Sequence, residues 1–160
     1  MIVRPATKAD TGAMAEILNA LIDAGGTTAL QTRVTAADLE AWMVSHAGRN
    51  AWHVAVDAEG QVLGFQLAEP HDDLPSDAID IASFARIGAG GKGVGATLFA
   101  ATSAACRAMG YRWINASIRS DNRSGLTYYG RMGFVDWDVD PDARLSDGTL
   151  TGKTHKRFDL

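Results

Sequence analysis

The sequence predicts a single α/β domain, spanning residues 1–160, in which helices flank a mixed β-sheet. A chain of 160 residues is close to the size of one domain, and it contains no internal repeat and no low-complexity stretch. Hydrophobic residues make up 46% of it and charged residues 21%, the ordinary balance of a globular protein. Sequential hairpins alternate with strand–helix–strand units, which favours a sheet with both antiparallel and parallel neighbours.

Several function classes are disfavoured by what the chain lacks. No apolar run reaches the roughly 18 residues that a membrane helix needs, and the N-terminus shows no secretory signal pattern. The single cysteine, Cys106, allows no internal disulfide, and no CxxC spacing indicates a metal site. We therefore expect a cytoplasmic protein that uses neither a membrane nor a metal.

The charge distribution disfavours nucleic acids as partners. Fifteen basic residues oppose 19 acidic ones, for a net charge of −4, and the basic residues are scattered rather than gathered in a stripe. The densest basic cluster, 153–157, is followed by apolar Phe158 in an alternating pattern. We interpret this segment as a solvated edge strand.

The first elements are a short strand over 2–4 and two helices. Asp10 is expected to cap the first helix, which Gly25–Gly26 ends. The second helix begins at Thr35, where Asp38 three residues later forms a capping-box pattern. The apolar residues of the two helices follow helical spacing: Met14, Ile17, Leu18, Leu21, Ile22, Leu39, Trp42 and Met43.

The middle of the chain predicts a hairpin and a third long strand. The strands 52–56 and 62–67 flank a turn at 57–60. A polar loop over 70–78 then leads to a strand at 79–87.

The second half begins with a glycine-rich stretch, 88–95, which leads directly into a helix that ends at Gly110. A strand follows at 113–118. The remaining elements are a helix over 121–132 ended by Gly133, a strand from Phe134, and a last hairpin around 146–148.

The order strand, glycines, helix predicts an anion site at 88–95. It exposes backbone N–H groups at a helix N-terminus, where the helix dipole favours negative charge. Five glycines among these eight residues let a diphosphate approach the backbone without side-chain collision. The alternative is a surface turn whose small residues serve close packing, and we favour the anion site.

The spacing of the turn separates the classes of phosphate ligand. A Walker loop needs Ser or Thr after its lysine, but Lys92 is followed by Gly93, so an ATP or GTP hydrolase is disfavoured. Gly88, Gly90 and Gly93 match a literal GxGxxG, but the next strand ends without the acidic residue that a dinucleotide site needs. A nicotinamide oxidoreductase therefore stays a remote alternative.

Two motifs resemble those of the GCN5-related N-acetyltransferases. Residues 91–98, Gly-Lys-Gly-Val-Gly-Ala-Thr-Leu, are similar to the acyl-CoA-binding turn of that family. The opening 2–10 and the segment 62–65 also fit, so the resemblance covers nearly the whole chain, and the loop 26–28 and helix 39–42 look most like the phosphinothricin-type and amino-acid acetyltransferases. The second motif resembles an asparagine followed by a helix tyrosine and a terminal Gly-Phe: Asn122, Gly125, Tyr129, Gly133 and Phe134.

The resemblance implies a GNAT-like α/β (α+β) fold and acetyl-CoA as co-substrate, without a metal. The sheet would be mostly antiparallel, with about seven strands and a V-shaped splay between the fourth and fifth, which receives the pantetheine arm. Gly90 stands where the family usually has Gln or Arg, so one side-chain contact to the pyrophosphate is absent. The implied coenzyme-binding residues are Phe84 and Ala85, through their backbone, with Gly91, Lys92, Gly93, Val94, Gly95, Ala96 and Asn122.

The implied reaction is direct attack of an amine on the thioester, which needs an acid and a base. Tyr129 is the candidate acid, since a phenol pKa near 10 suits donation to a departing thiolate; the alternative is a core aromatic, the role expected of Tyr128. Asp80 is the candidate base, directly or through a water, and a solvated carboxylate is its alternative. Glu69 and His71 are rivals for the same role.

The implied acceptor is the primary amine of a small molecule. Thr27, Thr28 and Glu69 are expected to border its site, and the acidic loop 71–77 leans toward a cationic amine. Amino acid, amino-acid analogue, polyamine and antibiotic all remain open. A homodimer is an expectation from the family, and a non-catalytic acyl-CoA sensor is the alternative function.

Overall fold

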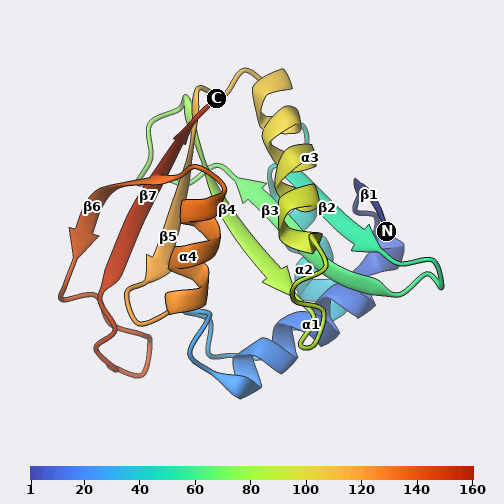
Figure 1. The fold of residues 1–160 in the computed structure, drawn as a ribbon, viewed down its shortest axis with the longest axis horizontal. Coiled ribbons are helices and arrows are strands. Elements are labelled where there is room, and N and C mark those ends of the chain that lie inside the picture. Colours follow the sequence, from blue (N-terminus) through green and yellow to red (C-terminus); the bar gives the residue numbers. More distant parts are fainter.

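A computed structural model describes all 160 residues, which form one open sheet with helices on both faces (Figure 1). Short turns join most of the elements, as the glycine and polar segments of the sequence predict. The strands are β1 (Ile2–Pro5), β2 (Ala51–Val56), β3 (Val62–Glu69), β4 (Ala78–Ala85), β5 (Trp113–Arg119), β6 (Val135–Asp140) and β7 (Lys153–Asp159). The α-helices are α1 (Thr11–Ala24), α2 (Ala36–Ser45), α3 (Val94–Ala108) and α4 (Arg123–Arg131), and a 3₁₀ turn over Lys8–Asp10 precedes α1.

The sheet has the order β1-β2-β3-β4-β5-β7-β6, and β4–β5 is its one parallel pair. That pair is hydrogen-bonded only from Ala78 to Ile81, against Trp113 to Ala116. Beyond this point the two strands part, as Figure 1 shows where β4 and β5 diverge. The expected seven-stranded sheet and the V-shaped splay between its fourth and fifth strands are confirmed.

The alternation of side chains along β3 and β4 separates two cores. Phe65, Leu67 and Phe84 face α1 and α2, where they form a cluster with helix residues such as Leu18. The opposite face packs on α3 and α4 through a second cluster that includes Ile79. Successive strand residues point to opposite faces, so neighbouring positions of β4 serve different sides of the splay.

The two N-terminal helices begin in different ways. Thr35 and Asp38 form the predicted capping box, in which the Asp38 N–H donates to Thr35 Oγ1 at 3.1 Å and the Thr35 N–H donates to Asp38 Oδ2 at 2.8 Å. The prediction for Asp10 is wrong in part: it occupies the cap position of α1, but its carboxylate accepts from Arg4 and from the Thr7 N–H. A bidentate guanidinium is the stronger partner for that carboxylate.

The basic segment 153–157 is not an edge strand. It lies in β7, which pairs with β5 on one side and β6 on the other. The edge is β6, whose six residues are all exposed. Alternating polar and apolar residues show that one face of a strand is exposed to solvent, but they do not show whether the strand has one neighbour or two. The prediction of an edge strand was wrong for this reason.

The ends of the remaining elements follow the local chemistry. β4 stops at Ala85 rather than at Ile87, because Gly88, with φ of +90°, already belongs to the turn that follows. Gly110, also at φ +90°, follows the end of α3 as expected. None of the helices is long and apolar enough to cross a lipid bilayer.

Candidate active site

A cleft of about 770 Å³ opens where β4 and β5 part. Its walls come from both halves of the sheet, from the loop after α1 and from the loop between β6 and β7. The structure therefore brings together residues that are far apart in the chain. Those predicted from the sequence that line it are Thr27, Thr28, Glu69, His71, Asp80, Phe84, Asn122 and Tyr129.

The glycine turn leads into α3 beside this cleft: none of residues 91–96 lines it, but Gly95 is hydrogen-bonded to Tyr128, which does. Gly93 takes the left-handed conformation (φ +73°) immediately before the first helical residue. None of the N–H groups from Gly91 to Ala96 donates a hydrogen bond within the protein. Gly90 faces open space, so the position that usually carries Gln or Arg has room for such a side chain. These donors at a helix N-terminus suit a pyrophosphate.

Beyond Ile81, β4 has free backbone groups on the side that faces the splay. The Arg86 N–H donates to the Leu63 carbonyl at 2.8 Å, and the Phe84 carbonyl points toward Gly64, both on the β3 side. Because N–H and C=O groups alternate in direction along a strand, those of Ser83 and Ala85 point into the gap. Phe84 contributes its side chain to the cleft, whereas the free backbone is that of Ser83 and Ala85.

Tyr129 lies on α4 with 6% of its surface exposed and lines the cleft. Its hydroxyl is 2.8 Å from Ser83 Oγ. Burial raises the pKa of the Tyr129 phenol above its ordinary value, and the nearby Asp80 carboxyl adds to this, although the Ser83 hydrogen bond opposes it. The phenol is protonated at neutral pH and is a weaker acid than an exposed tyrosine.

Tyr128 does more than pack. Its ring lies against Gly95, where a Cβ would approach it to 2.5 Å, and its hydroxyl donates to the Gly95 carbonyl at 2.8 Å. The same hydroxyl accepts a hydrogen bond from Gln66 Nε2 at 3.1 Å. Tyr128 thus connects α4 to the first turn of α3, and the interpretation of it as a core aromatic was incomplete.

Asp80 is partly buried on the cleft wall, near the point where β4 and β5 part. Its carboxylate accepts from Asn115 Nδ2 at 2.7 Å. Burial raises the pKa of Asp80, against the opposing effects of Asn115 and of the nearby His71, His155 and Lys153. A carboxylate with a raised pKa is a better proton acceptor than an ordinary aspartate, which suits the role predicted for it.

The rival base Glu69 is occupied by structural partners. Trp52 Nε1 and Asn50 Nδ2 donate to its Oε1, and His46 Nδ1 lies 2.9 Å from its Oε2. The Glu69 carboxylate is thus held by three groups, although it stands directly opposite Asp80 in the β3–β4 register. His71, the other rival, is half exposed and accepts from the Asp73 N–H of its own loop.

Both polar atoms of the Asn122 side chain are hydrogen-bonded within the protein. Its Oδ1 accepts from the Gly125 N–H at 3.0 Å, which makes it the N-cap of α4 as the sequence allowed. Its Nδ2 donates to the Thr27 carbonyl at 3.0 Å, and Arg119 Nη1 donates to the Thr28 carbonyl at the same distance. The predicted contact of Asn122 with the coenzyme stays a prediction.

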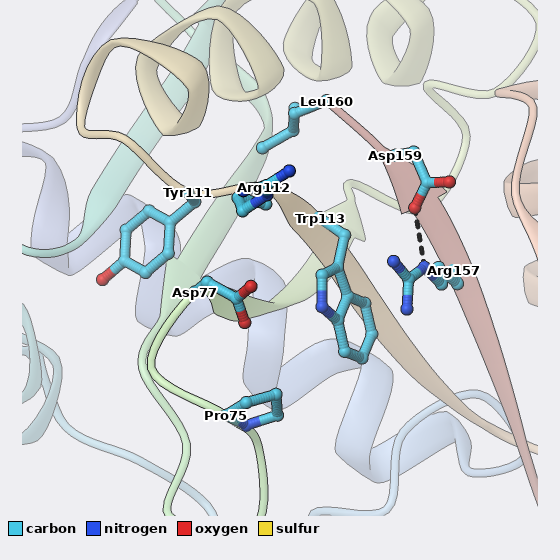
Figure 2. A pocket seen from close by; sticks show the side chains of 8 residues that line it. All are labelled: Pro75, Asp77, Tyr111, Arg112, Trp113, Arg157, Asp159 and Leu160. Atoms are coloured by element: carbon cyan, nitrogen blue, oxygen red, sulfur yellow. Dashed lines mark hydrogen bonds and ion pairs between the residues drawn. The ribbon is translucent and has the colours of Figure 1, made fainter.

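A second cavity, of about 720 Å³, lies beyond the paired end of β4 and β5 (Figure 2). Figure 2 shows Arg157 between Trp113 and Asp159. The guanidinium lies 4.2 Å from the centroid of the Trp113 ring and its Nε donates to Asp159 at 2.6 Å. None of the predicted site residues lines this cavity.

The structure offers neither a metal centre nor a cysteine nucleophile. No group of three or more His, Cys, Asp or Glu side chains is placed to hold a metal ion. Burial raises the pKa of the Cys106 thiol to about 12, and its side chain is fully buried. Cys106 is a small core residue, as expected.

Four polar residues at or beside the cleft were not identified from the sequence: Gln66, Ser83, Asn115 and His46. Gln66 and Ser83 face each other in the β3–β4 register, and Asn115 faces Asp80 across the β4–β5 pair. A polar residue at a buried strand position is the one signal that the sequence holds for the first three. His46 follows the end of α2 and is brought to the cleft by Glu69 alone.

Comparison with known proteins agrees with the geometry. No protein-family model matches the chain. A Streptomyces coelicolor relative named phosphinothricin N-acetyltransferase is 28% identical over 137 residues, which cover 82% of this chain and 80% of the relative.

Solved structures of similar fold include a GNAT-superfamily phosphinothricin acetyltransferase from Sinorhizobium meliloti in complex with AcCoA. It has a TM-score of 0.90, 22% identity, and coverage of 99% of this chain and 88% of that one. A ribosomal-protein-alanine N-acetyltransferase from Brucella melitensis has a TM-score of 0.91, 21% identity and full coverage of both chains. At these identities the two structures establish the fold. The resemblance drawn from the two sequence motifs is therefore confirmed: the chain has the fold of the GCN5-related N-acetyltransferases and, in sequence, resembles the phosphinothricin type.

Proposed function

We propose that this protein transfers the acetyl group of acetyl-CoA to the primary amine of a small molecule. The observation that carries the proposal is the parting of β4 and β5 beside a helix whose first N–H groups have no partner in the protein. The gap has the form of a slot for the pantetheine arm, and the amides supply the donors that its pyrophosphate requires.

Tyr129 is the general acid in this proposal. The amine nitrogen attacks the thioester carbonyl, a C–N bond forms and the C–S bond breaks, and its electron pair goes to sulfur. Tyr129 gives its proton to that sulfur, so that CoA leaves as a thiol, and the phenolate recovers a proton from solvent. Its support is its position on the cleft, where its phenol is protonated at neutral pH; burial makes it a weaker acid, and the Ser83 hydrogen bond opposes that effect.

Asp80 is the base that takes the proton lost by the amine, directly or through a water. Two observations favour it over Glu69: one side chain donates to Asp80, whereas three groups hold Glu69. The raised pKa of Asp80 makes it a better proton acceptor than an ordinary aspartate.

The loop after α1 favours a small acceptor over a protein. Gln31 Oε1 accepts from the Ser146 hydroxyl at 2.6 Å and from the Asp147 N–H at 2.9 Å. With the contacts of Asn122 and Arg119 to the Thr27 and Thr28 carbonyls, these bonds tie the loop across the splay. A folded protein chain would need this closed end to open, whereas a small molecule fits inside.

The charges in the cleft refine the acceptor that the sequence suggested. Asp80 and Glu69 suit an amine, but His71, His155 and Lys153 lie near Asp80 as well. We propose an acceptor that carries an anionic group beside its amine, such as an amino acid or phosphinothricin, the compound that appears in the names of the relatives. This replaces the purely cationic amine that the loop 71–77 alone favoured.

We also propose a homodimer located in the cytoplasm. Val135 and Val139 on the edge strand β6 are more than half exposed, and a second copy would cover them. Light scattering after size-exclusion chromatography is expected to give twice the chain mass, and the mass of one chain would contradict the dimer.

Two measurements test the function. Calorimetry with acetyl-CoA, CoA and NADH is expected to show binding of the first two and none of the third. Thiol release is then measured with phosphinothricin, standard amino acids, spermidine and an aminoglycoside. It is expected with phosphinothricin or with the amino acids. Tight CoA binding without thiol release for any amine would indicate the alternative, an acyl-CoA sensor, and NADH binding would contradict the proposal.

A further inference from the structure

We propose that Ser83 is a positioning residue for Tyr129: it donates a hydrogen bond to the phenolic oxygen, which leaves the Tyr129 proton free for the departing sulfur. The inference rests on the proposed function, in which Tyr129 is the acid. It assigns a role to a strand residue that neither sequence motif contains.

The observation behind it is a continuous chain of hydrogen bonds from the glycine turn to the acid. The Tyr128 hydroxyl donates to the Gly95 carbonyl at 2.8 Å. Gln66 Nε2 donates both to the Tyr128 hydroxyl, at 3.1 Å, and to Ser83 Oγ, at 2.8 Å. Ser83 Oγ then lies 2.8 Å from the Tyr129 hydroxyl. The chain joins α3, α4, β3 and β4.

The Gly95 carbonyl fixes the direction of the first two hydrogen bonds in this chain. A carbonyl can only accept, so the one hydrogen of the Tyr128 hydroxyl is used on Gly95. The group that faces the Tyr128 oxygen must therefore donate, which assigns Nε2 to that side of the Gln66 amide. The same Nε2 donates to Ser83 Oγ, which leaves the Ser83 hydrogen free, and we assign it to the Tyr129 oxygen, 2.8 Å away. The reverse direction, in which Ser83 Oγ accepts from Tyr129 as well, is the arrangement that the experiment below tests.

The orientation of the Gln66 amide decides which of its atoms faces the two hydroxyls. The residue is fully buried, and its Oε1 has no hydrogen-bond partner. Turning the amide over would pair Oε1 with Ser83, but it would also set Oε1 against the Tyr128 oxygen, whose hydrogen is already used. This orientation leaves one buried amide oxygen without a partner and gains the two hydrogen bonds that Nε2 donates to Ser83 and Tyr128.

The consequence for chemistry concerns the Tyr129 hydrogen. With its oxygen accepting from Ser83, the phenol has its own hydrogen available for an acceptor in the splay, where the free backbone of Ser83 and Ala85 marks the expected path of the pantetheine arm. Hydrogen bonds in a chain polarise one another, so the donor from Ser83 also makes Tyr129 a stronger hydrogen-bond donor. Ser83 thus offsets part of the effect of burial on this phenol.

The thiol of bound CoA gives a test that needs no acceptor. A hydrogen bond from Tyr129 to the thiolate favours the charged form, so the thiol of CoA in the wild-type complex is expected to titrate lower than in Ser83→Ala. The thiolate absorbance near 240 nm reports this, and we expect a difference of about half a pH unit or more. Tyr129→Phe should show the higher value, and adding Ser83→Ala to it should change nothing further.

Turnover provides the second measurement, with the acceptor found most active in the amine panel. Ser83→Ala is expected to lower kcat about tenfold and leave the KM for acetyl-CoA unchanged, but to change kcat less than twofold in the Tyr129→Phe background. Ser83→Thr keeps the hydroxyl, and Ser83→Val has the shape of threonine without the hydroxyl. The Thr variant should therefore stay near wild type, and the Val variant should behave as the Ala variant does. Ser103→Ala, which removes another buried hydroxyl on α3, is the control for hydroxyl loss.

The outcomes separate this inference from the function on which it rests. Equal losses from Ser83→Ala in the wild-type and Tyr129→Phe backgrounds would overturn it, because Ser83 would then act independently of Tyr129. Equal activity of the Thr and Val variants would overturn it as well, and this comparison holds if the Ala variant does not fold. Unchanged turnover and titration in Tyr129→Phe would remove the acid and the inference together, whereas acetyl transfer itself would stand.

Discussion

The coenzyme side and the acceptor side of the cleft are built from different materials. The part proposed for the pyrophosphate of the coenzyme is one contiguous segment, 88–96, beside the cleft, and its donors are backbone N–H groups. The part proposed for the acceptor collects side chains from several strands, from α4 and from three loops, and its chemistry lies in groups such as Asp80 and Tyr129. The first should therefore be sensitive to backbone conformation and tolerant of side chains, and the second the reverse.

The largest effect is expected on the acceptor side, from Tyr129→Phe. Loss of the acid should lower kcat about 100-fold, while the KM for acetyl-CoA stays within twofold, because the backbone turn is untouched. Steady-state kinetics with thiol detection measures both. Tyr111→Phe removes a hydroxyl that donates to the Arg49 carbonyl, away from the cleft, and should leave both constants unchanged. An unchanged kcat in Tyr129→Phe would remove this tyrosine from the chemistry.

The two neighbouring carboxylates should respond in opposite ways. Glu69→Gln replaces a buried acceptor of three hydrogen bonds and should lower the free energy of unfolding by about 2 kcal/mol. The Asp80 pKa is raised in the folded state, so the folded protein favours the protonated form, and stability falls as pH rises from the unfolded value of 3.8 toward the folded one. Asp80→Asn should therefore be at least as stable as wild type at pH 7.

The effects of the two substitutions on activity should be the reverse of their effects on stability. kcat/KM of the wild type should rise with pH through the raised pKa of Asp80, as its carboxylate forms, and Asp80→Asn should lose this limb and about tenfold in rate. Urea unfolding and pH–rate profiles measure the two properties. A Glu69→Gln protein that stays stable but loses the pH-dependent limb would exchange the roles of the two carboxylates.

On the coenzyme side, conformation should matter at Gly93 and not at Gly90. A side chain in the left-handed conformation of Gly93 costs about 1–2 kcal/mol, so Gly93→Ala should weaken acetyl-CoA binding about tenfold. Gly90 has no positive φ and faces open space, so Gly90→Ala is the matched control and should bind as wild type does. Calorimetry decides, and equal affinities of the two variants would place the pyrophosphate elsewhere.

The smallest effect is expected from restoring the side chain that the turn lacks. Gly90→Arg adds a guanidinium beside the free amides of the turn and should tighten acetyl-CoA binding about threefold at low salt, less at high salt. Binding isotherms at two salt concentrations measure this gain. Weaker binding than in Gly90→Ala would show that the pyrophosphate does not lie within reach of this position.

The same difference in construction explains what the sequence could predict. The glycine turn and its helix are local, so strand, glycines and helix could be recognised in order, and so could the position of Tyr129 before Gly133. The pairing of Gln66 with Ser83 depends on the β3–β4 register, and the interior place of β7 depends on β6 joining its far side. Neither the Gln66–Ser83 pairing nor the interior position of β7 can be recognised from the adjacent residues in the sequence.

Asp10 and Glu69 show the other limit of local reasoning. Asp10 stands at the cap of α1, but Arg4, on the adjacent strand, takes its carboxylate. Glu69 has a residue type that suits a base, but its three partners, from the loop after α2 and from β2, occupy its carboxylate. In both cases the partner lies outside the local pattern, and it determines what the side chain can do.

The central claim is that the amides at the start of α3 bind the pyrophosphate of the coenzyme beside the splay of β4 and β5. Titration of ¹⁵N-labelled protein with CoA, followed by amide chemical shifts, tests it directly. We expect the largest shifts at Lys92 to Ala96, with Ser83 and Ala85 next. Shifts gathered instead around Trp113 and Arg157, at the cavity of Figure 2, would contradict it.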